Sequence, residues 1–361
     1  MAKQYDITVY AQPSLYDAKE RTITIYFSEP ENGANEDTGI LLLNAGYGGE
    51  ANSNVFKKMR DTFADKYNYI TVQCNYFGWE YMQTPNVKDI SISYNELRSI
   101  LSDDQVELVL DDYDKNKYLL EGKIIEHNVE LGESADSFND MGPLQAIDSL
   151  TAIKVVADIL EQNNIIINKK RIHAYGFSHG AYINYLCNAF MPGVFSGIID
   201  NSAYVVPKYL NYKREVKCYI DKLFFHKSFF RYLLFDIVFD KELYDLTEVY
   251  NEICNKAKVI SFHGMKDDMT SFEEKKHFLE LTKKYEMIVI DEDKVDGDIF
   301  KSCTHGLDAD FLKMFDYVME NYDLDNDVEG LSFTGQTIKT KEYIYRIDLV
   351  EGMPKLTCDK K

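Results

Sequence analysis

The feature that most constrains the fold of this sequence is a long alternation of short apolar runs with amphipathic segments. Ile40–Leu43 is a continuous apolar run, of the kind found in a strand that is buried on both faces. Asn54–Lys66 then has the pattern of a helix, and the apolar run YITVQC follows it. This order predicts a βαβ unit and therefore a parallel sheet.

The same alternation continues further along the chain. Between Leu144 and Leu160, apolar residues recur at steps of three and four, which predicts a helix with one apolar face. The further elements that we expect are the strand Arg171–Tyr175, a helix between Gly180 and Pro192, the strand Phe195–Ile199, the strand Val259–Phe262, the helix Phe272–Tyr285, the strand Met287–Ile290 and the helix Ala309–Glu320. An alternation of this length predicts the α/β class, with a doubly wound, mostly parallel sheet.

Three segments depart from this pattern within what we expect to be a single domain over residues 1–361. Residues 79–140 are polar and irregular and predict an insertion on the surface. Residues 204–256 are rich in aromatic side chains, and we expect them to form a helical lid insertion. Residues 329–361 contain alternating runs that predict a C-terminal β extension, and the opening segments YDITVYAQ and RTITIYFSE predict two antiparallel strands.

Charge and cysteine spacing narrow the classes of partner and cofactor. The chain has 60 acidic and 40 basic side chains, a formal charge of -20, which disfavours nucleic acid as a partner. It has no signal-peptide pattern and no apolar window long enough for a membrane span, so we expect a cytoplasmic protein. The six cysteines are scattered without a CxxC pair, which implies no disulfide framework and no metal site. The oligomeric state is not predicted by these features.

The motif GFSHG, within RIHAYGFSHGAY, places Ser178 between Gly176 and Gly180. A GxSxG pentapeptide has chemical meaning where a strand turns sharply into a helix, because this turn lifts the serine hydroxyl above the sheet. Here an apolar run precedes the motif and a helical pattern follows it. Ser178 is therefore a candidate nucleophile, whereas a glycine-rich turn with an incidental serine is the alternative.

A nucleophilic serine needs a histidine as base and a carboxylate to orient that histidine. In α/β-hydrolases the chain order is Ser, acid, His, with both partners in loops after later strands. VISFHGMKDDM contains Asp267 and Asp268 after an apolar strand, and KSCTHGLD contains His305 beyond the last core strand. We expect Asp267 to be the acid, with Asp268 and Asp200 as alternatives.

The other histidines have simpler explanations. Four of them are expected to be structural or solvated, His263 is expected to shape the acid loop, and His179 is expected to contribute its backbone N–H; the four are His127, His173, His226 and His277. The oxyanion of an acyl-transfer intermediate needs two N–H donors. We expect one from His179, and the other from Tyr47 or Gly48 in the loop NAGYGG after the early buried strand.

Together, NAGYGG, GFSHG, HGMKDD and THG resemble the α/β-hydrolase superfamily, particularly its esterase and prolyl-oligopeptidase-like branches, over about residues 40–320. The resemblance aligns Asp267 with the acid of an HGxxD pattern. The sequence departs from it at Asn44, where many esterases have His, and it contains no propeller domain, which weakens a peptidase interpretation. More distantly, the chain is similar to an uncharacterised bacterial family associated with flagellar and surface-glycan loci.

The sequence hypothesis is a cofactor-free serine esterase that acts on a small-molecule or glycan ester through Ser178, His305 and Asp267. A short acyl group on a polar alcohol is the expected substrate. The lid aromatics either line the site or form the lid's own core; they are Phe224, Phe225, Phe229, Phe230, Tyr232 and Phe235. Two alternatives remain open, namely an acyltransferase with the same triad and a non-catalytic binding protein on a hydrolase fold.

Overall fold

The computed structural model describes residues 1–83, 92–324 and 330–361. Its centre is an eight-stranded sheet with the strand order β1-β2-β4-β3-β6-β7-β10-β11. These strands are β1 (Lys3–Ala11), β2 (Arg21–Glu29), β3 (Gly39–Asn44), β4 (Tyr69–Cys74), β6 (Ile172–Phe177), β7 (Gly197–Asn201), β10 (Lys258–Gly264) and β11 (Tyr285–Ile290). β1 and β2 are antiparallel to their neighbours, and the strands from β4 to β11 are parallel.

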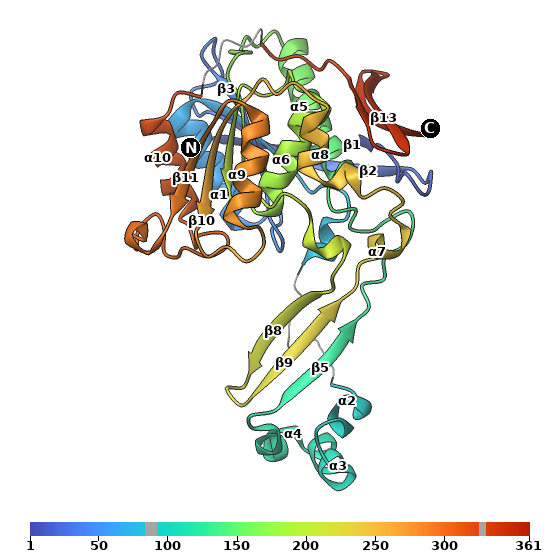
Figure 1. The fold of residues 1–361 in the computed structure, drawn as a ribbon. Coiled ribbons are helices and arrows are strands. Elements are labelled where there is room, and N and C mark those ends of the chain that lie inside the picture. Colours follow the sequence, from blue (N-terminus) through green and yellow to red (C-terminus); the bar gives the residue numbers. More distant parts are fainter. Residues whose placement is uncertain (84–91, 325–329) are drawn as a thin grey trace.

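Helices cover both faces of the sheet, as Figure 1 shows. α1 (Asn54–Tyr67) and α10 (Phe311–Asn321) contribute to the core on one face. The other face carries α5 (Pro143–Gln162), α6 (His179–Phe190), α8 (Leu246–Asn251) and α9 (Phe272–Thr282). The predicted fold class, an α/β fold with a doubly wound and mostly parallel sheet, is therefore confirmed.

The apolar run in β3 explains why this strand lies inside the sheet. Successive side chains of a strand point to opposite faces. Ile40 and Leu42 accordingly belong to the core beneath α5 and α6, whereas Leu41 and Leu43 belong to the core beneath α1 and α10. A strand covered on both faces needs apolar residues at every position, which is the pattern of this run.

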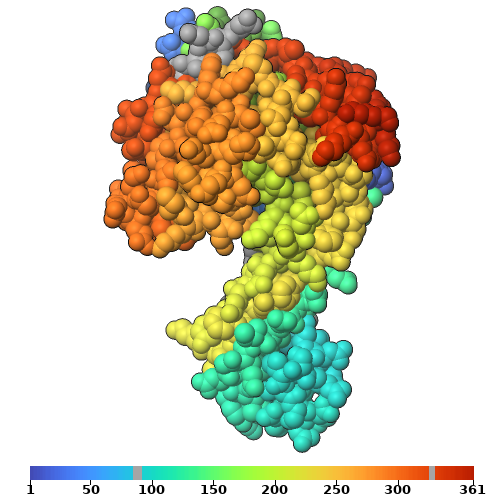
Figure 2. All heavy atoms as spheres, in the orientation of Figure 1, coloured from blue at the N-terminus to red at the C-terminus, as the bar shows by residue number. Residues whose placement is uncertain are grey.

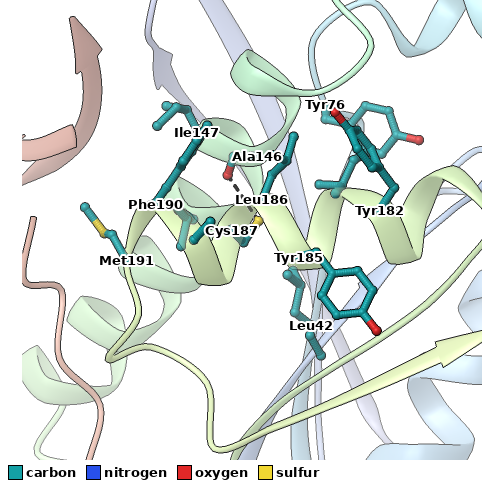
Figure 3. Packing of buried hydrophobic residues seen from close by; sticks show 14 of the residues in the cluster. Leu42, Tyr76, Ala146, Ile147, Tyr182, Tyr185, Leu186, Cys187, Phe190 and Met191 are labelled. Atoms are coloured by element: carbon teal, nitrogen blue, oxygen red, sulfur yellow. Dashed lines mark hydrogen bonds between the residues drawn. The ribbon is translucent and has the colours of Figure 1, made fainter. Parts of the chain in front are cut away.

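α6 is the most enclosed helix near the site, because every residue in it is buried. Figure 3 shows side chains from several sides of this helix packed against its surroundings, with Leu186 and Cys187 near Ala146 and Ile147 of α5. The Cys187 thiol donates to the carbonyl of Ala146 at 3.4 Å. This packing fixes the helix whose first turn follows Ser178.

The two insertions combine into one arm, which projects from the body in Figures 1 and 2. β5 (Ile124–Val129) comes from the first insertion, and β8 (Arg214–Ile220) and β9 (Phe224–Phe230) come from the second. β5 pairs in parallel with β9, and β9 pairs antiparallel with β8. The end of the arm carries α2 (Tyr94–Arg98), α3 (Asp103–Asp111) and α4 (Tyr113–Asn116), which have a small apolar core of their own.

The expectation of a helical segment over residues 204–256 is wrong for its aromatic stretch. In β9 the side chains of Phe224, His226, Ser228 and Phe230 are buried, and those between them are partly exposed. This is the two-residue period of a strand, and the sequence KLFFHKSFF carries it. Short helices do occur in the remainder of the segment, namely α7 (Leu234–Ile237) and α8.

The C-terminal residues form a separate, antiparallel sheet beside the body. It consists of β12 (Gln336–Lys339), β13 (Tyr343–Val350) and β14 (Met353–Lys360). The Gln12 side chain fastens this sheet, because it donates to the Leu356 carbonyl and accepts from the Leu356 N–H, both at 2.7 Å. Short 3₁₀ turns complete the described secondary structure, at Trp79–Met82, Lys117–Leu120, Lys208–Leu210, Glu242–Tyr244 and Glu292–Lys294.

Candidate active site

Ser178 occupies a sharp turn between β6 and α6. Its backbone has φ 51° and ψ -121°, a conformation that residues with a side chain rarely adopt. The two glycines make the turn sterically possible. A Cβ on Gly176 would lie 2.6 Å from the Ala181 nitrogen, and one on Gly180 would lie 2.1 Å from the Asn44 carbonyl oxygen. The strand-turn-helix context that the motif requires is therefore present.

Ser178, His305 and Asp267 lie in hydrogen-bonding order. The Ser178 Oγ is 2.7 Å from His305 Nε2, and His305 Nδ1 is 2.9 Å from Asp267 Oδ2. Since a carboxylate only accepts, Nδ1 carries the proton and Nε2 accepts from the serine hydroxyl. The Asp267 side chain is 1% exposed and that of His305 is 22% exposed, so the acid is shielded while the histidine faces the site.

Asp267 is held as a carboxylate. Burial alone would raise the pKa of Asp267, but the hydrogen bond and the electrostatic attraction of the His305 ring outweigh it and keep that pKa below its ordinary value. Backbone N–H groups add to this effect, since Met269 donates to Asp267 Oδ1 at 2.8 Å. An ionised acid can fix the histidine tautomer and stabilise the imidazolium.

The loop that carries His305 lies directly against the acid loop. A Cβ on Gly264, at the end of β10, would lie 2.5 Å from the Cys303 carbonyl oxygen, so only glycine permits this approach. Lys266 donates its N–H to the same carbonyl at 2.8 Å. Asn201 connects the serine turn to the loop that carries His305. Its carbonyl accepts from the Ser178 N–H at 2.7 Å, and its side chain donates to the Gly306 carbonyl at 3.2 Å. Sequence reasoning did not identify Asn201, and no sequence motif marks it.

The two alternative acids do not contact His305. Asp200 is fully buried and pairs with the ammonium of Lys275, and it accepts hydrogen bonds from the Tyr185 and Ser261 hydroxyls at 2.8 Å. Asp268 is exposed to solvent. The geometry therefore associates the histidine with Asp267.

The loop with the expected second oxyanion donor lies beside the serine turn. Gly49 donates its N–H to the Gly46 carbonyl at 3.1 Å and closes a tight turn, in which Gly48 has φ 78°. A Cβ on Gly46 would lie 2.8 Å from the ring of Phe177, the residue before Ser178. The Tyr47 and Gly48 amides are thus carried on a turn that touches the serine turn.

The backbone N–H of His179 lies at the start of α6, next to Ser178, whereas the His179 side chain points into the core. His179 is the first residue of α6, so its N–H has no acceptor within the helix. The imidazole is fully buried, and burial lowers its pKa to about 3. It hydrogen-bonds to the Tyr204 hydroxyl and to Gln145 Oε1.

The remaining histidines lie inside the sheet, in the arm, on α9 and at the end of β10. His173 binds the Tyr69 hydroxyl inside the sheet, His127 and His226 lie side by side in the arm, and His277 is exposed on α9. His263 is buried at the end of β10, and burial lowers its pKa, with a smaller contribution from the charge of Lys275.

The base of the arm reaches the Tyr47 turn. The ring of Tyr47 lies 5.3 Å from that of Tyr209 and 6.3 Å from that of Tyr232, centre to centre. The guanidinium of Arg214, at the start of β8, lies 5.0 Å from the centre of the Tyr47 ring. Of the six aromatics expected in a lid, Tyr232 alone packs against this turn within the described part of the chain, and Phe224 lies in the core at the end of the arm.

The described residues include no group of three or more His, Cys, Asp or Glu side chains placed to hold a metal ion. Within the same residues, no helix combines the length and the apolar character that a membrane crossing requires.

Comparison with known proteins gives one family and several solved structures. The family model described as "Protein of unknown function (DUF2920)" matches residues 82–320. No curated protein matches the sequence. Est1E from Butyrivibrio proteoclasticus is similar with 13% identity and a TM-score of 0.44, covering 87% of this chain and 96% of its own.

Two further solved structures are similar to this chain at comparable sequence identities and TM-scores. The apo form of Thermogutta terrifontis esterase 2 has 12% identity and a TM-score of 0.42, over 88% of this chain and 97% of its own. An acylaminoacyl peptidase in complex with Z-Gly-Gly-Phe-chloromethyl ketone has 14% identity and a TM-score of 0.48, over 92% of this chain and 43% of its own. What the site does therefore has to be argued from its own residues.

Proposed function

Because this chain belongs to the family described as "Protein of unknown function (DUF2920)", its activity has to be inferred from its site, and we propose that it is a serine hydrolase that cleaves a carboxylic ester. The observation that carries the proposal is the 2.7 Å contact between Ser178 Oγ and His305 Nε2, at a strand-to-helix turn, with Asp267 on the opposite ring nitrogen. This set of contacts activates a hydroxyl for nucleophilic attack.

The proposed reaction has two steps. The Ser178 Oγ attacks the ester carbonyl carbon while its proton moves to His305 Nε2, and the carbonyl oxygen becomes an oxyanion. His305 then gives this proton to the leaving alcohol, which leaves an acyl-serine. A water molecule attacks the acyl-serine with His305 as base, and the acid product departs as Ser178 regains its proton.

The oxyanion is proposed to accept hydrogen bonds from the His179 N–H and from the Tyr47 or Gly48 N–H. The positions of these amides support the proposal. The His179 amide begins α6 directly after the serine, and the Tyr47 and Gly48 amides belong to the turn packed on Phe177. Fixed donors of this kind stabilise developing charge without reorganisation during the reaction.

We further propose a short acyl group, acetyl first, on a polar alcohol. The rings of Tyr209 and Tyr232 and the guanidinium of Arg214 gather around the Tyr47 turn, so the arm base acts as the lid in this proposal. The formal charge of -20 disfavours docking on anionic lipid surfaces. A sugar hydroxyl as the alcohol rests on the resemblance to a family associated with surface-glycan loci.

A fluorophosphonate probe tests the proposal. An activated serine forms a covalent phosphonyl adduct, so mass spectrometry of a digest should place the adduct on Ser178 and should find none in Ser178→Ala. A wild-type protein that stays unlabelled would instead favour a non-catalytic binding protein. An acyltransferase would also be labelled, and it is recognised by acyl transfer to an added sugar in preference to water.

A further inference from the structure

A chain of hydrogen bonds, buried except where it reaches the half-buried Tyr47, links the two loops that carry the proposed oxyanion donors. It runs from Tyr204 to His179, from His179 to Gln145, from Gln145 to Asn139 and from Asn139 to Tyr47. Two of its members, His179 and Tyr47, carry candidate amides, and Tyr204 forms the end beyond His179. Its middle members, Gln145 on α5 and Asn139 just before α5, belong to neither loop.

We propose that Gln145 and Asn139 are positioning residues that hold the His179 and Tyr47 amides in register for one oxyanion. This inference rests on the proposed function, since it concerns the same site. The two side chains touch no reacting atom, and they act through His179 and Tyr47.

The direction of each hydrogen bond follows from the chemistry of the groups. Gln145 Nε2 donates to Asn139 Oδ1 and to the Phe77 carbonyl, both at 3.0 Å, so Gln145 Oε1 is the acceptor that faces His179. The His179 Nε2 is 2.5 Å from this oxygen and must carry the proton. His179 Nδ1 is then unprotonated and accepts from the Tyr204 hydroxyl.

The other half of the chain is equally directed. Asn139 Oδ1 also accepts from the Met141 N–H at 3.1 Å, which fixes the orientation of its amide group. Asn139 Nδ2 therefore points the other way and donates to the Tyr47 hydroxyl at 3.1 Å. Each polar group has one arrangement that satisfies its neighbours.

Burial makes the arrangement stiff. Gln145, Asn139 and His179 are all 0% exposed, so water cannot replace a lost partner. Burial also lowers the pKa of His179 to about 3, which keeps the imidazole neutral and its donor and acceptor roles fixed at neutral pH. The Tyr47 ring adds a direct contact, since its centre lies 5.2 Å from that of the His179 ring.

The test compares Gln145→Leu and Asn139→Leu with a matched control. Asn188→Leu is the control, because Asn188 is a buried amide on α6 that binds Tyr250 and Asn255 and contacts neither loop. We measure kcat and KM for p-nitrophenyl acetate, the melting temperature, and the affinity for a short trifluoromethyl ketone. This ketone forms a tetrahedral serine adduct with an oxyanion, so its affinity reports the donors.

Gln145→Leu and Asn139→Leu should each lose about 10- to 100-fold in kcat with little change in KM, because a misplaced oxyanion donor costs less than a deleted one. Their affinity for the ketone should fall by the same factor. Asn188→Leu should lose thermal stability while keeping its kcat. A wild-type kcat in the chain variants, or an equal loss in the control, would overturn the inference.

Milder variants cover the case in which a leucine variant does not fold. Tyr204→Phe and Tyr47→Phe each delete one hydroxyl at an end of the chain, and both should lower kcat by about 3- to 30-fold with KM preserved. If both keep the wild-type kcat, the chain does not position the donors. A wild-type protein without esterase activity or probe labelling refutes the proposed function instead, which separates the two failures.

Discussion

The turn at Ser178 depends on residues that have no role in chemistry. At Gly176, Gly180 and Gly264 a Cβ would clash with backbone atoms. Because these residues have no side chain, the loops that carry the serine, the acid and the histidine can lie close together. Asn201 then ties the Ser178 N–H to the Gly306 carbonyl. At the scale of single residues, the site is a product of close backbone approach.

The acid can be identified by comparing three variants. Asp267→Asn should lower kcat/KM by about 10⁴, because the amide no longer stabilises the required histidine tautomer. Asp268→Asn should stay near wild type, since Asp268 is exposed. Measured kcat/KM values that rank Asp268→Asn below Asp267→Asn would contradict the assignment.

Asp200→Asn serves as the control for stability. It removes the charge that pairs with the buried ammonium of Lys275, so it should destabilise the fold by about 3–5 kcal/mol. Thermal unfolding should therefore separate this variant from Asp267→Asn, whose main loss is in rate.

Some of the site was predictable from the sequence, and some was not. GxSxG and HGxxD are local patterns, so Ser178 and Asp267 could be singled out, and His305 followed from the chain order. Asn139, Gln145 and Asn201 are ordinary polar residues in the sequence. Their partners are distant along the chain, and only the fold brings those partners within hydrogen-bonding distance.

At the scale of elements, the sheet was predictable and the arm was not. Apolar runs such as Ile40–Leu43 report burial directly, whereas β5 has the mixed sequence IIEHNV and partly exposed residues. Its parallel partner β9 comes from the other insertion. A non-local pairing of this kind leaves no signal in either segment, and the aromatic clusters of β9 obscured its two-residue period.

The end of the arm should unfold independently of the body. Its core is separate and consists of Leu97, Val106, Val109, Leu120, Ile125 and Phe224. Leu97→Ala should weaken that core by about 2–5 kcal/mol, because a buried leucine leaves a cavity. Hydrogen exchange should then rise in residues 94–120 and stay unchanged in α6, and a uniform rise through the body would contradict this separation.

At the scale of the whole molecule, the body carries the site and the arm meets it at its base. Figure 2 shows the arm standing clear of the body over most of its length. The base, in contrast, places Arg214, Tyr209 and Tyr232 around the Tyr47 turn. We therefore propose that this base is the part of the insertions that bears on substrate choice.

This arrangement predicts the acyl preference. The ratio of kcat/KM for p-nitrophenyl acetate to that for the octanoyl ester should be about tenfold or more, because crowded aromatic rings leave little room for a long chain. The ratio is measured under one set of conditions with both esters below their solubility limits. A clear octanoyl preference would point to a lipid or thioester substrate.

We propose that Ser178 and His305 act as one catalytic unit, and the decisive measurement is kcat for p-nitrophenyl acetate in Ser178→Ala, His305→Ala and the double variant. In each single variant kcat should fall by about 10⁴- to 10⁶-fold, and it should fall no further in the double variant, because loss of either residue already disables the unit. Wild-type turnover in folded Ser178→Ala, or a double variant much slower than either single variant, would contradict the account.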